Sequence, residues 1–451
     1  MKIAFVSPAG AMHRYNGLFH KNLHYAPITL TLLTALVPKE LNAELKIYDE
    51  TAEAIPLNLD ADVVCITCIT GTSERSYRFA DYFRSKGKAV IIGGVHPSLL
   101  PNEAKEHADS VIVGLGERSL PKALIDYSDG CLQEYYYQQP CDNIANRPLP
   151  RRDLLKKKKY ITLNTVEAVR GCNLNCNFCA YPKAFGRNIY TRPIEDIVAE
   201  IKTLKGKTIV FPDVNLLADY EYAKELFRAL IPLKKWWLGL TTSEIGLDDE
   251  MLSLFKKSGC KGLLIGFESV NQASQKEMRK GVNKVAEYKI LMEKLHNYGI
   301  MVMGCFAFGS DEDYKDVFER TVEMVQECKI DLPRYAILTP FPNTDLYSDL
   351  ESEKRITEKN WALYDAEHVV YEPKNMTKQE LEDGIKWAWK ETYKISNIFR
   401  RIAWSKPILH ALGIFVNIGY RKYAKEFDIF SEKVMMDNSD IPDAFNVELS
   451  K

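Results

Sequence analysis

Three of the ten cysteines in this chain stand close together in the segment RGCNLNCNFC. Cys172, Cys176 and Cys179 have the spacing C-x3-C-x2-C, and the segment follows the apolar run ITLNTVEAV. Thiolates are the ligands of iron–sulfur clusters, and this tight spacing lets one loop reach three corners of a cubic cluster. We therefore predict a [4Fe–4S] cluster held by these three cysteines, on a loop at the carboxyl end of a strand.

The number of cysteines in the loop separates three kinds of metal site. A zinc site would include a fourth Cys or His in paired spacing, and none lies nearby in the sequence. An electron-carrying [4Fe–4S] cluster is held by four Cys. Three ligands leave one iron with an open coordination site, which suits a cluster that binds a further molecule.

The elements that must position this loop form an α/β region, residues 160–342. Six apolar runs are expected to be strands: ITLNTVEAV, TIVFPD, WWLGLTT, GLLIGFES, MVMGCFAFG and YAILTP. Helical segments such as PIEDIVAEIKTLKG separate them. Six β/α units are too few for an eight-stranded barrel and fit a partial (β/α)6 barrel, in which the chemistry lies at the carboxyl ends of the strands.

Residues 1–139 are expected to form another α/β domain. The runs KIAFVS, ELKIYD, VVCIT, AVIIGG and SVIVG alternate with helical segments, which indicates a doubly wound, Rossmann-like parallel sheet covered on both faces. The polar, proline-bearing stretch 140–159 is expected to be a linker. Residues 343–451 lose the strand pattern, and segments such as KQELEDGIKWAWKETYKISNIFRRI predict a mainly helical region.

The charge balance argues against a dedicated nucleic-acid binder. Sixty Lys and Arg face 61 Asp and Glu, for a net charge of −1, whereas nucleic-acid proteins usually carry a basic excess. The start MKIAFVSPAG predicts a buried strand rather than a signal peptide. The longest late apolar stretch, Pro407 to Ile418, is shorter than the about 20 residues that span a bilayer. We expect a cytoplasmic protein, and this stretch is either a helix that caps the barrel or one that contacts a membrane peripherally.

The cysteine loop and three later motifs resemble the radical S-adenosylmethionine (SAM) superfamily along residues 160–342. Phe178, before the last cysteine, also fits that pattern. The resemblance implies that SAM binds the open iron and is cleaved to a 5′-deoxyadenosyl radical. It also implies SAM contacts from three segments: Pro212, Asp213 and Asn215 in PDVN, Ser243 and Glu244 after the next strand, and Gly266 and Glu268 in GFES.

The N-terminal domain resembles the cobalamin-binding domains that precede some radical SAM cores. Glycines and small hydroxyl residues after parallel strands let backbone amides approach a nucleotide tail closely. The resemblance implies cobalamin contacts from Asp49, Thr70, Thr72, Ser73, Gly93, Gly94, Gly116 and Glu117. Thr51 stands where the D-x-H-x-x-G motif has its histidine, so we expect cobalt without a protein imidazole below it.

The whole chain is similar to the lineage of the anaerobic bacteriochlorophyll cyclase and the hopanoid methylases, through LPRRDLL, LTPFPNTDLY, HVVYEPKNMT and NIGYRK. This resemblance implies C-methylation of an unactivated carbon in a small or lipid-like molecule, with flavodoxin or ferredoxin as the external electron donor. Two alternatives stay open: the same cofactors with cyclisation, dehydration or carbon–carbon coupling, and a non-catalytic iron–sulfur electron-transfer or binding protein. No catalytic side chain is assigned from the sequence.

Overall fold

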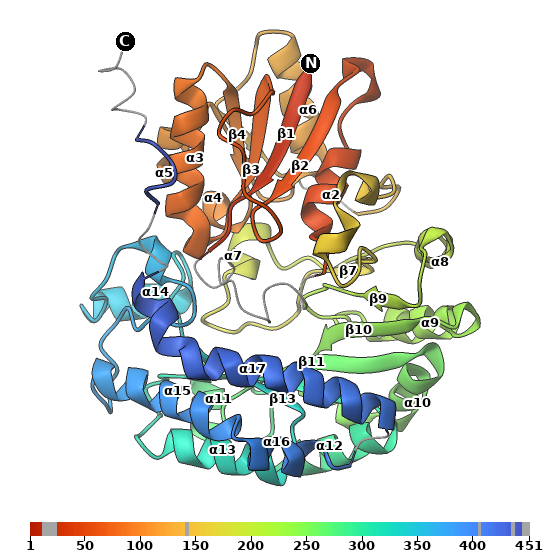
Figure 1. Cartoon of the computed structure of the whole chain (residues 1–451), viewed down its shortest axis with the longest axis vertical. Coiled ribbons are helices and arrows are strands. Elements are labelled where there is room, and N and C mark those ends of the chain that lie inside the picture. Colours follow the sequence, from red (N-terminus) through yellow and green to blue (C-terminus); the bar gives the residue numbers. More distant parts are fainter. Residues whose placement is uncertain (11–24, 140–143, 405–406, 434–437, 444–451) are drawn as a thin grey trace.

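The computed structural model describes residues 1–10, 25–139, 144–404, 407–433 and 438–443. Two parallel sheets stack one above the other, and a helical C-terminal region lies beside the lower sheet (Figure 1). The expected linker begins in one of the gaps, so residues 140–143 lie outside the described chain.

The N-terminal sheet has six parallel strands in the order β2-β1-β3-β4-β5-β6. Its strands are β1 (Lys2–Ser7), β2 (Glu44–Asp49), β3 (Val63–Thr67), β4 (Ala89–Gly93), β5 (Ser110–Val113) and β6 (Tyr135–Tyr137). Its helices are α2 (Ile28–Ala35), α3 (Ser73–Ser85), α4 (Val95–Leu99), α5 (Pro101–His107) and α6 (Gly116–Ser128). The doubly wound fold is confirmed, and its order reverses between β1 and β3, which is where ligands bind in such sheets.

The second sheet has five parallel strands in the order β13-β12-β11-β10-β9. Its strands are β9 (Thr208–Val210), β10 (Trp236–Thr241), β11 (Cys260–Glu268), β12 (Met301–Phe308) and β13 (Leu332–Ile337). Its helices are α8 (Ile194–Thr203), α9 (Tyr220–Leu230), α10 (Asp249–Ser258), α11 (Gln272–Glu277), α12 (Tyr288–Asn297) and α13 (Val317–Glu327). The sheet curls into a partial barrel, as the sequence predicts.

The first of the six expected barrel strands is not a strand of this sheet. To this sheet the run ITLNTVEAV contributes only an isolated parallel bridge between Thr165 and Val210, and a second isolated bridge joins Thr162 to Tyr25. Asp213 Oδ1 accepts hydrogen bonds from the backbone N–H groups of Ala168 (2.8 Å) and Val169, so these amides are not available to a ladder. The chain then turns into a two-residue strand, β7 (Val169–Arg170), which pairs antiparallel with β8 (Tyr190–Thr191).

The C-terminal region is helical, as expected. Its helices are α14 (Asp345–Ser352), α15 (Lys378–Thr392), α16 (Ile395–Ile402) and α17 (Pro407–Lys433). Tyr420 and Tyr423 of α17 pack against Trp389 of α15, and Asn417 donates to the carbonyl of Asp331 beside β13 at 3.1 Å. Within the described residues, no helix combines the length and apolar character needed to cross a membrane.

Candidate functional site

The three clustered cysteines lie on the loop between β7 and the short helix α7 (Tyr181–Phe185). All three thiols are half-buried. Gly171 opens the loop at φ 112°, and a side chain there would collide with the carbonyl oxygen of Asn188. The backbone N–H of Cys179 donates to the carbonyl of Cys176 at 3.2 Å, which curls the loop back on itself.

A buried ion pair stands beside the cysteine loop. Lys280 is paired with Glu268 at the carboxyl end of β11. Burial raises the pKa of the Cys176 thiol to about 12, and the positive charge of Lys280 opposes that rise. Burial also raises the pKa of Cys179. A nearby ammonium favours thiolate, the form that binds iron.

The described residues contain no group of three or more His, Cys, Asp or Glu side chains that is already gathered as metal ligands. A four-iron cluster bonds each cysteine to a different iron, so its protein ligands do not converge on a point. The donor set of the loop is three thiols, and among the described residues no further Cys or His is gathered with them, which fits such a cluster with one iron left open.

The PDVN loop after β9 reaches the cysteine loop. Asn215 is buried, and its Nδ2 lies 3.5 Å from Oδ1 of Asn173, the residue after Cys172. Asp213 is 2% exposed, and its Oδ2 makes no hydrogen bond to the described residues. Burial, and then the charge of Glu167, raises the pKa of Asp213 to about 7. This loop therefore places a buried, unpartnered carboxyl oxygen beside Ala168 and Val169, which lead into the cysteine loop.

The other predicted SAM residues follow β10 and β11. Ser243 Oγ donates to Asn283 Oδ1 at 2.7 Å, and Glu244 Oε2 accepts from the hydroxyl of Thr242 at 3.3 Å. Gly266 leaves the room that the Lys280–Glu268 pair occupies, since a Cβ there would lie 2.7 Å from the Lys280 ammonium. These segments end neighbouring strands and so share the rim of the barrel.

A cavity of about 310 Å³ lies between the N-terminal sheet and the second α/β region. Its apolar wall comes from the sheet, α2 and α6, and includes Phe5, Leu30 and Leu120. Its opposite wall includes Arg170 and Tyr181. Six of the predicted cofactor residues line it: Gly93, Gly94, Gly116, Glu117, Pro212 and Asp213. The structure thus brings residues predicted for two different cofactors to one space.

At the edge of this cavity, Gly94 cannot be replaced by another residue without strain. Its φ of 119° and ψ of −165° belong to a region that only glycine adopts readily. A Cβ at this position would lie 2.5 Å from the carbonyl oxygen of Cys68. The close approach of backbone to backbone leaves the carboxyl end of β4 free of side chains.

Four predicted cobalamin residues lie away from the cavity. Asp49 is buried and accepts hydrogen bonds from the hydroxyls of Thr51 (2.7 Å) and Tyr160 (2.9 Å). Thr70, Thr72 and Ser73 are buried in a turn whose Gly71 lies against the backbone of Tyr364. These residues hold the N-terminal domain to Tyr160, at the start of the second α/β region, and to the C-terminal region.

His96 belongs to the same contact. It is fully buried, with Nε2 2.9 Å from Glu103 Oε1 and Nδ1 3.3 Å from the Thr70 hydroxyl. Glu103 also accepts from the indole N–H of Trp361 at 2.9 Å. The histidine therefore links the N-terminal domain to the C-terminal region.

The sequence does not predict a buried network of ion pairs that lies at the cavity wall. Arg170 is paired with Glu117 and with Glu167 (2.7 Å), and Arg147 is 2.5 Å from Glu167. Burial alone would raise the pKa of Glu167, but the charges of Arg170 and Arg147 outweigh it and hold the pKa at about 2. Glu117 lies in the first turn of α6 and Arg170 lies two residues before Cys172, so this network joins the two α/β regions beside the cluster loop.

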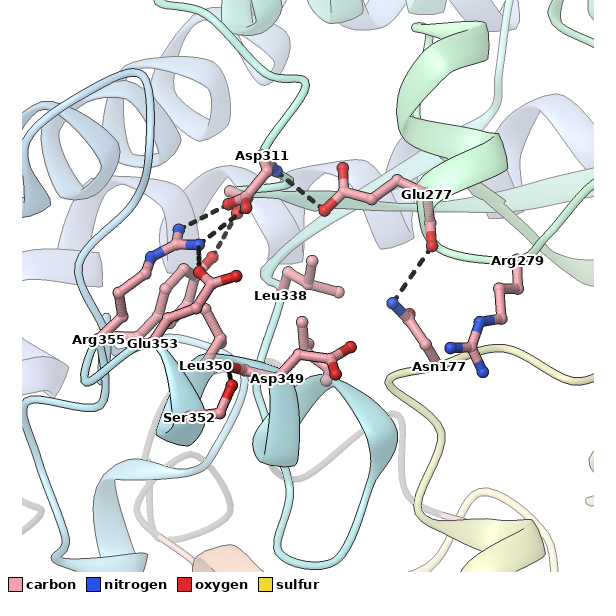
Figure 2. A pocket seen from close by; sticks show the side chains of 13 residues that line it. Asn177, Glu277, Arg279, Asp311, Leu338, Asp349, Leu350, Ser352, Glu353 and Arg355 are labelled. Carbon is pink, nitrogen blue, oxygen red and sulfur yellow. Dashed lines mark hydrogen bonds and ion pairs between the residues drawn. The ribbon is translucent and has the colours of Figure 1, made fainter.

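A second hollow, of about 260 Å³, borders Asn177, the residue after Cys176 (Figure 2). Its lining is charged, with Arg355 bound to both carboxylate oxygens of Asp311 at 2.6 and 2.8 Å. Asn177 Nδ2 donates to the carbonyl of Glu277 at 3.2 Å, and its backbone is bonded by residues at the end of α11 and the start of α14. These contacts fix the cysteine loop against both helices.

Each of the two α/β regions contains a sheet of parallel strands, and a cavity and a loop with three thiols lie where the regions meet. This arrangement defines a cofactor-dependent α/β enzyme. Residues 166–357 match the model of the radical SAM superfamily. The chain is 30% identical over 393 residues to the bacteriochlorophyllide d C-12(1)-methyltransferase of Chlorobaculum tepidum, covering 85% of each chain. This protein belongs to the radical SAM superfamily, and membership implies a [4Fe–4S] cluster and SAM.

Further relatives support the same placement. The bacteriochlorophyllide d C-8(2)-methyltransferase of Chlorobaculum tepidum is 27% identical over 438 residues, 86% of this chain and 93% of its own. The cobalamin-dependent SAM radical enzyme OxsB, solved with aqua-cobalamin and SAM, superposes with a TM-score of 0.68 at 14% identity, over 100% of this chain and 75% of that chain. That structure shares the fold of both α/β regions.

Proposed function

We propose that this enzyme binds cobalamin between its two sheets and C-methylates an unactivated carbon of a small hydrophobic molecule. The observation that carries the proposal is the interdomain cavity, which Gly93, Gly94 and Gly116 border on one side and Asp213 on the other. When bound, the cluster and SAM supply one-electron chemistry and cobalamin supplies the methyl group.

The cavity suits a bulky, flat cofactor tail. Its wall from the N-terminal sheet and from α2 and α6 is apolar, and the glycines at the strand ends leave backbone amides accessible. In doubly wound sheets such cofactors bind at the carboxyl ends of the strands. Thr51 offers no imidazole to cobalt, and its hydroxyl is bonded to Asp49.

The cysteine loop and the barrel rim are proposed to hold the cluster and SAM. Cys172, Cys176 and Cys179 supply the thiolates, and the unpartnered carboxyl oxygen of Asp213 accepts a hydrogen bond from the SAM amino group. Ser243, Glu244, Gly266 and Glu268 contribute the remaining rim. The buried network of Arg170 fixes how the two regions face each other, which excludes water from the space between the cofactors.

The substrate, the electron donor and the location complete the proposal. Named relatives methylate bacteriochlorophyllide d, and another is a hopanoid C-3 methylase, so a small pigment-like or lipid-like substrate fits best. Electrons come from an external flavodoxin or ferredoxin in the cytoplasm. Phe415 and Ile418 on α17 are about half exposed, which supports peripheral contact with a membrane that carries such a substrate.

Anaerobic reconstitution with iron, sulfide, cobalamin and SAM tests this function. With a strong reductant the protein is expected to release 5′-deoxyadenosine, and none at full cluster occupancy would contradict radical chemistry. With bacteriochlorophyllide d as trial substrate, S-adenosylhomocysteine together with 5′-deoxyadenosine indicates methyl transfer. 5′-Deoxyadenosine alone indicates another radical reaction. The visible spectrum of the desalted protein measures cobalamin retention.

A further inference from the structure

The concave face of the second sheet carries side chains that the cofactor sites do not use. Along β12 and β13, Phe306 and Tyr335 are buried on the outer face, where Tyr335 packs against Trp389 of α15. Side chains alternate along a strand, so Cys305 and Arg334 point to the opposite, inner face. These two residues are directly paired across the strands.

Four apolar residues form a floor on this inner face. They lie in register on neighbouring strands: Leu240, Leu264, Met303 and Leu332. Each is half-buried, although apolar side chains fill the interior of a closed barrel. Part of the apolar floor is therefore exposed, and a hydrophobic molecule that covers it would remove this area from water.

Arg334 stands next to the apolar floor, nearer the carboxyl ends of the strands. It is half-buried and makes no hydrogen bond or ion pair with any residue that the structure describes. Its neighbours on this face are small: Cys305 beside it and Ala336 and Ala307 toward the rim. A guanidinium has five N–H donors, and burying it without an acceptor is costly.

The groups that act electrostatically on Arg334 are Tyr420, Cys305, Tyr423 and Glu367. Burial raises the pKa of both phenols and of the thiol, so these three groups carry no charge at neutral pH. The Glu367 carboxyl accepts a hydrogen bond from Tyr423, and burial raises its pKa to about 7, so it is part-protonated at neutral pH. A single planar cation without a second one beside it matches one carboxylate, which it can bind through two parallel hydrogen bonds.

We propose that Arg334 binds a carboxylate of the substrate while the hydrophobic body of the substrate covers the apolar floor. This inference rests on the proposed function, because it names the substrate class of the same active site. Cys305 is close enough to Lys280 and Glu268 for their charges to act on it, and that pair stands beside Cys176. A carboxylate bound at Arg334 therefore lies between the apolar floor and the cluster loop.

Matched acids and esters test the inference without knowledge of the substrate. Pyropheophorbide a and its methyl ester form one pair, and palmitate and methyl palmitate form another. Each is titrated anaerobically into the reconstituted holoenzyme. At least one acid is expected to bind about 10- to 100-fold more tightly than its ester, since hydrogen bonds to a charged group contribute about 1.5–3 kcal/mol. Equal affinity within both pairs, or no binding of either acid, overturns the proposal.

Variants assign the preference to one side chain. Arg334→Gln is expected to bring the affinity for the acid down to that for the ester, and Arg334→Lys to keep part of the preference. Arg320→Gln, at an exposed ion pair with Asp316, is the matched control and keeps it in full. If Arg334→Gln does not fold, the Arg334→Lys result decides, and a full preference there overturns the proposal.

The failure of this inference differs from the failure of the proposed function. Wild-type protein that cleaves SAM but binds acids and esters equally retains the radical function and loses the carboxylate site. Wild-type protein that prefers an acid but yields no 5′-deoxyadenosine retains the carboxylate site and loses the radical function.

Discussion

The two parallel sheets present very different groups at their carboxyl ends. The N-terminal sheet ends in glycines around an apolar cavity, and its charged groups lie at the wall or in contacts between domains. The second sheet ends beside thiols, a buried Lys280–Glu268 pair and the unpartnered carboxyl of Asp213. The same topology thus serves two tasks, since one rim accommodates a molecule by shape and the other supplies chemistry.

The two regions depend on each other through a buried ion pair. Glu117 lies in the first turn of α6 in the N-terminal region, and its partner Arg170 precedes the cysteine loop of the second region. This ion pair joins the region that forms the cavity to the region that carries the cysteine loop. The carboxyl ends of the second sheet, beside the thiols, are the chemical rim, and those of the N-terminal sheet, around the cavity, are the shaped rim. Loss of a thiolate at the chemical rim should abolish turnover with little effect on folding. Changes at the shaped rim or at the pair should act first on stability and cofactor retention.

The largest expected effect comes from the chemical rim. Cys176→Ala removes one of three thiolates, so we expect loss of the cluster and of all 5′-deoxyadenosine formation, with the secondary structure unchanged. Iron and sulfide content, together with product analysis, measure both. Cys131→Ser, at an exposed cysteine, should behave like the wild type. SAM cleavage by the Cys176 variant would show that the cluster is held elsewhere.

The next effect concerns the pair that joins the two regions. Arg170→Gln leaves Glu117 and Glu167 with Arg147 as their remaining buried cation, which costs about 3 kcal/mol in the free energy of unfolding. Arg320→Gln removes a surface pair and should cost less than about 1 kcal/mol. Urea denaturation measures both. Adding Glu117→Gln to Arg170→Gln should recover part of the loss, and equal costs for the two arginines would contradict a buried network.

At the shaped rim, two glycines with positive φ form a matched pair. Gly94→Ala places a Cβ against the Cys68 carbonyl in addition to the backbone strain, and should cost about 3 kcal/mol and reduce cobalamin retention. Gly130→Ala has φ +73° but nothing within 4 Å of the new Cβ, so about 1 kcal/mol of strain is expected alone. Similar losses in both variants would mean that the close approach at Gly94 is unimportant.

Sequence patterns predicted the parts of this molecule that depend on neighbouring residues. The strands of the N-terminal sheet were expected from their apolar runs, except β6, whose Tyr135–Tyr137 shows no alternation. The first barrel strand failed because Asp213, far along the chain, takes the N–H groups it needed. Arg170 and Glu117 are 53 residues apart, and no local pattern pairs them.

For the site residues too, the sequence predicts local features but not contacts between residues that are far apart in the chain. The cysteine spacing is local and visible in the sequence, so the loop could be located at once. Asp49 is predicted to contact cobalamin, and no local pattern shows that its carboxylate accepts a hydrogen bond from Tyr160, 111 residues away. Arg334 belongs to no sequence motif. Its proposed role depends on the small and apolar residues that the strand register places around it, so the sequence alone does not predict that role.

The smallest expected effect is a pH dependence at the chemical rim. Burial raises the pKa of Asp213 from 3.8 to about 7 in the folded protein. Between these values the folded state holds a proton that the unfolded state has lost, so the stability contributed at low pH falls as pH rises toward 7 and is constant above it. From pH 5 to 7 this amounts to about 2–3 kcal/mol. Asp213→Asn, which keeps an acceptor for the Ala168 and Val169 amides, should remove this slope. Urea unfolding of the cofactor-free protein at both pH values measures it, and a slope shared by variant and wild type would show that Asp213 is ionised throughout.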